Sequence, residues 1–148
     1  MPIDKIKDIV DYGIIGFLIF LSFITVVLFI ERLLFYRSVM LKEYSHEKEL
    51  ELDLGKNLSA IASIGSNAPY IGLLGTVLAI ILTFYIIGEH QDTIDPGEVM
   101  KHLALALKAT AAGLVVAIPA TAIYNMLLTK ADRLLAKWSV LKDRGQIR

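Results

Sequence analysis

Residues 70–88 read YIGLLGTVLAIILTFYIIG and contain no charged side chain. A helix needs about 20 apolar residues to cross the hydrocarbon core of a bilayer. The run does not alternate polar and apolar residues, as a strand of a membrane barrel does. It therefore predicts a transmembrane helix, and this helix decides the fold class of the chain.

Two further stretches have the same character. Residues 12–30 are uncharged, and residues 109–129 form another uncharged run that extends back to residue 103 if Lys108 is included. Backbone groups in lipid must be satisfied internally, which leaves helices for runs of this kind. The sequence predicts an all-α integral membrane protein with three transmembrane helices, at residues 12–30, 70–88 and 103–129, in a single domain of residues 1–148.

Composition disfavours several other classes of protein. Of the 148 residues 55% are hydrophobic and none is cysteine, so a disulfide framework or a thiolate metal site is impossible. The 15 basic and 15 acidic residues balance, so net charge gives no indication of nucleic-acid binding. No metal, cofactor or intramembrane enzyme is expected, because His46, His90 and His102 all lie outside the predicted hydrocarbon core and no phosphate loop occurs.

The first apolar run is expected to be a retained anchor. It is too long for the core of a signal peptide, and no cleavage site of small residues follows it. Residues 31–37, ERLLFYR, instead indicate a helix that continues into water.

Basic residues predict the orientation of the three helices, because lysine and arginine accumulate in cytoplasmic loops. The segment between the first two spans and the tail after the third together hold 11 of them, against three on the other side. The N-terminus is therefore expected outside. Residues 31–69 and 130–148 are expected in the cytoplasm, as long helical extensions of the spans.

Two segments outside the lipid leave choices open. Residues 1–11 place their aliphatic side chains near one helical face, so they form either a short helix on the outer surface or a frayed polar terminus. Residues 37–57 are expected to extend the first helix and then turn back, with Gly55 as the break.

The third helix is expected to be longer than its span. Residues 95–98, DPGE, are typical of a helix start, with a capping Asp, a Pro at the first position and a Glu at the third. At the other end, Leu134, Trp138 and Leu141 share one face, so the helix should continue into the cytoplasm until Gly145 stops it.

The second and third spans each carry a stripe of small and polar residues. Gly72, Thr76, Ala79 and Thr83 follow one another at i, i+4, i+7 and i+11, on one face of a helix. The third span repeats the pattern with Ala106, Thr110, Ala117, Thr121 and Asn125. The stripes line either a helix interface or a narrow polar lumen. A third alternative is that each Thr only bonds the carbonyl four residues back.

Glycine and proline positions indicate how these two helices pack and bend. Gly72, Gly75 and Gly113 permit close approach of neighbouring helices in a membrane. Pro69 is expected to kink or restart the second helix at the membrane surface, and Pro119 to kink the third.

No Asp or Glu lies inside any predicted span; Glu31 is at the edge of the first. A membrane proton relay normally needs a titrating side chain near the midplane. Hydroxyls orient water and pass protons, but they do not store a proton at neutral pH. If this chain moves protons, the titrating group is expected from a partner chain.

Lys108 is the one charge within a span. It lies about 8 Å from the outer start of that span, at about 1.5 Å per residue. A lysine at this depth reaches the outer headgroups by snorkelling and contacts lipid phosphate. Pairing with the carboxylate of a partner is the alternative.

Two motifs resemble a known family. Residues 68–77, APYIGLLGTV, resemble the A-P-x-x-G-L-x-G-T-V opening of the second helix of the MotA/TolQ/ExbB proton-channel family. Residues 106–120, ALKATAAGLVVAIPA, resemble its A-L-x-x-T-x-x-G-L-x-x-A-I-P-A motif in the third helix, and Tyr124 and Asn125 continue the match. The resemblance extends over residues 59–128.

The resemblance implies a function. Family members assemble as a pentamer around a dimer of a single-span partner that brings a membrane aspartate. Thr76 and Thr110 correspond to hydroxyls that face the central channel. Proton passage energises TonB-dependent outer-membrane transport of iron siderophores, vitamin B12 or metals, the Tol-Pal system, or the flagellar motor. The chain is thus expected in the bacterial inner membrane, with a periplasmic N-terminus and with an ExbD-like chain, a TonB-like protein and phospholipid as partners.

Two departures from the family pattern limit these expectations. Many members carry a glutamate in the segment before Thr110, and Leu105 stands at that position here. The cytoplasmic loop is also compact, which argues against a flagellar stator and favours an ExbB-type role over a TolQ-type role in envelope integrity. A purely structural membrane anchor is the remaining alternative.

Overall fold

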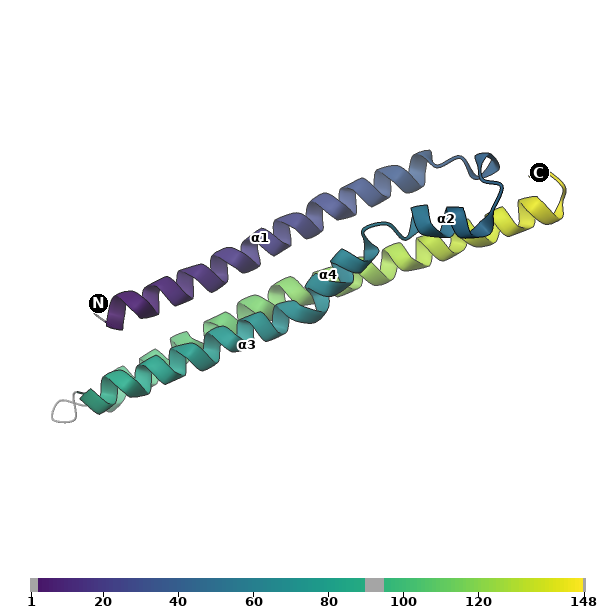
Figure 1. Cartoon of the computed structure of the whole chain (residues 1–148). Coiled ribbons are helices and arrows are strands. Elements are labelled where there is room, and N and C mark those ends of the chain that lie inside the picture. The colour runs from purple at the N-terminus through teal and green to yellow at the C-terminus, as the bar shows by residue number, and fades with distance from the viewer. Residues whose placement is uncertain (1–2, 90–94, 148) are drawn as a thin grey trace.

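A computed structural model describes residues 3–89 and 95–147 of the chain (Figure 1). Every regular element in these residues is helical, which confirms the predicted fold class. The elements are, in order, α1 Ile3–Ser38, the 3₁₀ turn η1 Leu41–Glu43, α2 Glu47–Leu54, α3 Leu58–Glu89 and α4 Pro96–Asp143.

The long helices α1, α3 and α4 lie side by side in an elongated bundle (Figure 1). Within the described residues these three helices are long and apolar enough to cross a membrane, as predicted. The start of α1 and the end of α3 lie at one end of the bundle, the N-terminal end. The short helix α2 and the last turns of α4 lie at the opposite end, the α2 end. Residues 90–94 of the predicted outer loop lie outside the described residues.

One prediction about helix continuity was wrong. From Ile3 on, the chain forms neither a separate surface helix nor a frayed terminus, because α1 begins there and runs unbroken into the first span. No Pro or Gly occurs between Ile3 and Tyr12 to stop it. At Pro69 two alternatives had been predicted, a kink or a restart, and the structure excludes the restart because α3 continues through this residue. A proline inside a helix removes a single backbone hydrogen bond to the residue four positions back, and the helix continues despite that loss.

The predicted ends of α4 were correct. The Asp95 carboxylate caps α4 by accepting a hydrogen bond of 3.0 Å from the Gly97 backbone N–H, and Pro96 occupies the first helical position. Gly145 follows the capping residue at the other end and adopts a φ of +74°, a conformation that favours glycine and stops the helix.

The expected extension of the first helix is shorter than predicted. Helix α1 ends at Ser38, and Gly55 breaks the separate helix α2, whose last residue it follows.

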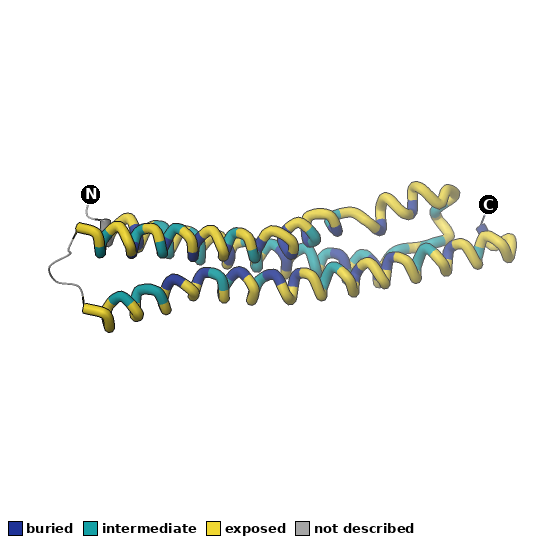
Figure 2. Tube along the Cα trace, turned by 90° about the horizontal axis from the view of Figure 1, so that it is seen from below, coloured by how far each residue is buried: buried dark blue, intermediate teal, exposed yellow. Residues whose placement is uncertain are grey.

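Buried side chains form two separate clusters. Figure 2 marks the buried residues in dark blue along the long helices. The first is small and consists of Leu18, Ala68 and Ala117, where the three long helices meet. The second is larger and lies at the α2 end, around Trp138 and Leu50. The predicted inner face of the α4 extension is confirmed, since Trp138 is 2% exposed and Leu134 and Leu141 pack against the same cluster.

Candidate functional site

Glycines bring the backbones of α3 and α4 into direct contact near the middle of the bundle. A Cβ atom added to Gly72 would lie 2.5 Å from the Ala109 carbonyl oxygen, and one added to Gly113 would lie 2.6 Å from the Ala68 carbonyl oxygen. At Gly75 an added Cβ would lie 2.8 Å from the Ala109 methyl group. Any side chain larger than hydrogen at these positions therefore forces the two helices apart.

The hydroxyl groups of Thr76 and Thr110 meet across this contact. Thr76 is 5% exposed, and its hydroxyl donates a hydrogen bond of 3.0 Å to the Ala106 carbonyl of α4. A second bond joins the hydroxyls of Thr76 and Thr110. Because Thr76 has only one hydroxyl hydrogen and gives it to Ala106, Thr110 is the donor in the second bond. Thr110 remains partly exposed, so it is the accessible member of the pair.

The other polar residues of the two stripes do not join this pair. Thr83 is buried, and its hydroxyl donates to the Ala79 carbonyl of its own helix at 2.7 Å. Thr121 and Asn125 lie on the exposed surface of α4. Thr121 nevertheless packs against α3, because a Cβ atom added to Gly65 would lie 2.7 Å from the Thr121 hydroxyl oxygen. The α4 stripe therefore follows the edge of the α3–α4 contact.

Thr121 and Asn125 instead line a surface groove between α3 and α4. The groove has a volume of about 430 Å³ and also contains Gly65 and Pro69. Outside this groove, the same part of α3 exposes further small polar side chains: Ser59, Ser63, Ser66 and Asn67. Pro119 is exposed in α4, inside a continuous helix, outside the lining of this groove.

Both α1 and the α3–α4 pair expose large apolar side chains around the level of this groove. Leu18, Ala68 and Ala117 are in one cluster and therefore at one level of the bundle. From that level toward the α2 end, α1 exposes large apolar side chains that include Phe20, Phe23 and Ile30. On α4, Val115 and Ile118 are exposed near the same level. The α3–α4 surface is therefore mixed, with the polar side chains of the groove standing among apolar ones.

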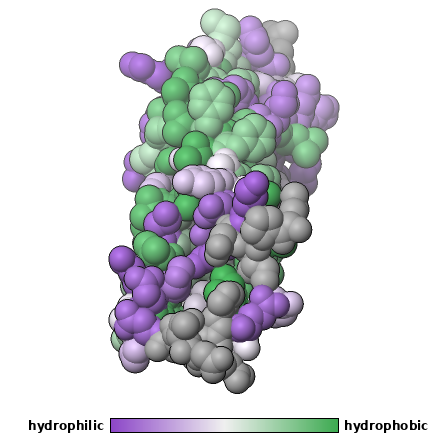
Figure 3. Space-filling view, turned by 90° about the vertical axis from the view of Figure 1, so that its left-hand side faces the viewer, coloured by the Kyte–Doolittle hydropathy of each residue, from purple (hydrophilic) through white to green (hydrophobic). Residues whose placement is uncertain are grey.

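Lys108 opens onto a polar pocket at the N-terminal end. The pocket has a volume of about 280 Å³ and is lined by Asp8 and Asp11 of α1, and by Leu105 and His102 of α4 among others. The turns of α1 that extend beyond the first span thus place two carboxylates near this lysine. Figure 3 views the molecule from this end and shows hydrophilic surface directly beside hydrophobic surface.

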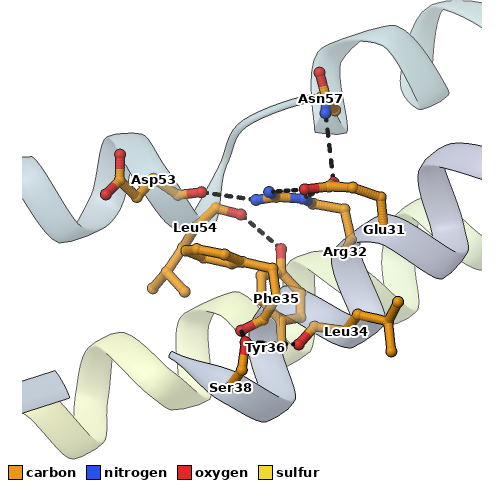
Figure 4. A network of polar contacts seen from close by, with 9 residues as sticks. All are labelled: Glu31, Arg32, Leu34, Phe35, Tyr36, Ser38, Asp53, Leu54 and Asn57. Carbon is orange, nitrogen blue, oxygen red and sulfur yellow. Dashed lines mark hydrogen bonds and ion pairs between the residues drawn. The ribbon is translucent and has the colours of Figure 1, made fainter. Parts of the chain in front are cut away.

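A buried arginine at the α2 end was missed by the sequence analysis. Arg32 is 2% exposed, forms an ion pair with Glu31 and donates to the Asp53 carbonyl at 2.7 Å (Figure 4). Tyr36 donates to the next carbonyl, Leu54, at 2.6 Å. These are carbonyls of the last turn of α2, which have no partner within the helix and attract a cation. The charge directly after the first apolar run was visible in the sequence, but its partner 21 residues later was not.

Comparison with known families identifies the chain. The MotA/TolQ/ExbB proton channel family matches residues 35–140. This chain belongs to that family. The match includes the α3–α4 contact and the α2 end, and it confirms the resemblance predicted from the two motifs. Together with the three apolar helices, it makes the chain a multi-pass membrane protein.

Relatives within the MotA/TolQ/ExbB family cover almost the full chain. The chain is 54% identical over 134 residues to the biopolymer transport protein "ExbB-like 2" of Helicobacter pylori, covering 90% of this chain and 89% of the relative. It is 50% identical over 138 residues to the biopolymer transport protein ExbB of Aquifex aeolicus, covering 93% of each. Similarity to the Tol-Pal system protein TolQ of Pseudomonas aeruginosa is lower, 36% over 100 residues, covering 65% of this chain and 41% of the relative.

Proposed function

We propose that this chain is the proton-channel scaffold subunit of an ExbB-type complex in the bacterial inner membrane, which couples proton flow to TonB-dependent outer-membrane transport. The observation that carries the proposal is the hydroxyl pair of Thr76 and Thr110 at the α3–α4 contact. It stands in spans that contain no carboxylate of their own. Such a site orients and passes protons but needs a titrating group from another chain.

The exposed polar positions of α4 support an arrangement around a lumen. Thr110, Thr121 and Asn125 are all at least partly exposed. With α1 toward lipid, each copy turns these side chains inward, and several copies in a ring enclose a channel. The partner is a single-span, ExbD-like chain whose membrane aspartate reaches Thr110, the accessible member of the pair. In this arrangement the N-terminal end is periplasmic and the α2 end cytoplasmic, as the basic residues indicate. A TonB-like protein then receives the energy that the proton flow releases.

Two observations favour an ExbB-type role over a TolQ-type role. The ExbB-named relatives of Helicobacter pylori and Aquifex aeolicus named above match 90–93% of the chain at 50–54% identity, whereas the TolQ relative matches 65% of it at 36%. In addition, the segment between α1 and α3 holds only one short helix of eight residues and a single 3₁₀ turn. The role of Lys108 is proposed as contact with lipid phosphate or with the nearby carboxylates of α1.

Proton flux into liposomes tests the proposal. The chain is reconstituted alone and together with its single-span partner, and internal pH is followed after a pH jump. We expect flux only with the partner present, and loss of that flux with Thr110→Val. Thr25→Val is the control, because Thr25 is a threonine of another span whose hydroxyl bonds only the Leu21 carbonyl of its own helix, at 2.9 Å. Equal flux without the partner would contradict the proposal.

A further inference from the structure

The part of α4 beyond the third span carries a stripe of positive charge. Its members follow one another at i, i+3, i+7 and i+14, which places them on one helical face. All are exposed, and we call them the basic stripe: Lys130, Arg133, Lys137 and Arg144. The two carboxylates of this segment, Asp132 and Asp143, lie on a different face. The positive charge is therefore concentrated on one flank of the helix.

Helix α2 carries the opposite charge at the same level of the bundle. Its eight residues include four exposed carboxylates and one lysine; the carboxylates are Glu47, Glu49, Glu51 and Asp53. Leu50 and Leu54 hold α2 in one cluster with Ala131 and Trp138 of α4. The carboxylates of α2 and the middle of the basic stripe thus lie equally far from the membrane.

No ion pair joins the two groups within the chain as far as it is described. The carboxylates of α2 form one ion pair, between Glu51 and Lys48 of the same helix at 3.4 Å. Asp53 accepts a hydrogen bond from the Tyr44 hydroxyl. The basic stripe takes part in none of the ion pairs found in residues 3–89 and 95–147. Both groups are therefore open to a partner.

The membrane surface explains only the first two members of the basic stripe. At about 1.5 Å per residue, Lys137 lies about 12 Å and Arg144 about 22 Å beyond residue 129, where the uncharged run ends. Attraction to anionic headgroups decays with a screening length of about 8 Å at physiological ionic strength. The outer part of the stripe is too far from the lipid to have it as its partner.

We propose that the basic stripe of α4 binds α2 of a second copy of this chain. The inference rests on the proposed function only for the orientation of the bundle across the membrane. Rotation about the membrane normal keeps every element at its own depth, so the α2 of a neighbouring copy meets the stripe at the right level. The contact uses two different surfaces on each copy, and repeated contacts of this kind close into a ring. Charge complementarity then sets which surfaces of neighbouring copies face each other.

Charge reversal of the purified full-length chain in mild detergent tests this contact. One variant carries Arg133→Glu and Lys137→Glu, and a second carries Glu49→Lys and Glu51→Lys. Each variant alone should raise the concentration at which the oligomer half-dissociates by about tenfold, since two weak exposed pairs become repulsive. The combined four-substitution chain should recover the original midpoint. A mixture of the two variants should recover it in large part, because each supplies the complementary surface of the other, although a ring with an odd number of copies keeps one repulsive contact.

The control reverses the charges of the other face, with Asp132→Lys and Asp143→Lys. It changes net charge as much as the α2 variant does, yet it should leave the midpoint unchanged. Recovery in the mixture also shows that the two separate variants had folded. The proposal is overturned if the combined chain and the mixture both remain as weak as the single variants, or if the control weakens the oligomer equally.

Mass and flux measurements separate this inference from the proposed function. Oligomer size is read by light scattering and requires no proton transport. A charge-dependent oligomer without partner-dependent flux would leave the α2–α4 contact in place and contradict the channel proposal. Partner-dependent flux from an oligomer that ignores all the reversals would contradict the contact alone.

Discussion

The two ends of this bundle hold their helices together by different means. In the middle and toward the N-terminal end, α3 and α4 meet through Gly72, Gly113 and the hydroxyl pair of Thr76 and Thr110. At the α2 end, the contacts are made by large buried side chains, above all Trp138, and by the arginine network of Figure 4.

The difference follows from the solvent around each region. Lipid tails are as apolar as leucine, so burying a large apolar side chain inside a membrane gives little driving force. Close backbone packing and hydroxyl bonds must hold the helices there. In water, removing apolar surface from the solvent is the dominant favourable contribution, which suits a cluster of Trp and Leu. The α2 end is thus built like a soluble domain, and the α3–α4 contact is built like a membrane interface.

The largest expected effect is from Trp138→Ala at the α2 end. Truncating a buried tryptophan costs about 3–5 kcal/mol in a soluble core, because apolar area and packing are both lost. The indole N–H bond to the Tyr44 carbonyl, 3.0 Å long, is lost as well. Protease susceptibility of residues 39–57 in the reconstituted chain should rise strongly. Trp138→Phe, which keeps most of the ring, should have a clearly smaller effect; an equal effect would mean that packing is not the cause.

Gly72→Ala should destabilise the α3–α4 contact by adding an atom, whereas Trp138→Ala removes atoms from the α2 end. Its Cβ would lie 2.5 Å from the Ala109 carbonyl, so the helices must separate. Overpacking of this kind costs about 1–3 kcal/mol. Unfolding in mixed micelles of increasing denaturing detergent measures the loss. Gly88→Ala is the matched control, since no atom lies within 4 Å of its added Cβ, and it should unfold with the wild-type chain.

Thr76→Val tests the hydrogen bond between α3 and α4 by itself, because it removes the hydroxyl and keeps the shape of the side chain. Interhelical hydrogen bonds in membranes contribute about 0.6 kcal/mol on average. The shift in the unfolding midpoint should therefore be small, but larger than that of Thr25→Val, whose bond lies within one helix. If Thr25→Val destabilised the chain as much, the bond between α3 and α4 would contribute no more to stability than a bond within one helix.

The smallest expected effect is a pH dependence at the α2 end. A hydrogen bond to the Asp53 carboxylate, then burial and neighbouring negative charge, raises the pKa of Tyr44 to about 12. Because the pKa is raised in the folded chain, protonated Tyr44 stabilises the fold fully below its ordinary pKa of about 10. This stabilisation disappears as pH rises through about 12. Wild-type stability should therefore fall over this interval relative to Tyr44→Phe. Parallel pH profiles would contradict this assignment.

Sequence patterns predicted the features that depend on neighbouring residues. The three apolar runs, the Asp95 cap and the Gly145 stop all follow from short-range rules, and all are present. Features that depend on distant packing were not predictable. Arg32 meets the end of α2 only after the chain has turned back, and the exposed positions of Thr121 and Asn125 depend on where α3 crosses α4.

Two roles are assigned to different parts of the bundle: the α3–α4 hydroxyl pair passes protons, and the α2 end stabilises the fold. Proton flux and unfolding midpoint, measured together in liposomes with the single-span partner, test this assignment most directly for Thr110→Val and Arg32→Met. Thr110→Val should lose the flux with little change in stability. Arg32→Met removes the bonds to Glu31 and the Asp53 carbonyl, so it should lower stability and keep the flux per folded complex. Full flux through Thr110→Val, with flux lost in folded Arg32→Met, would contradict the account.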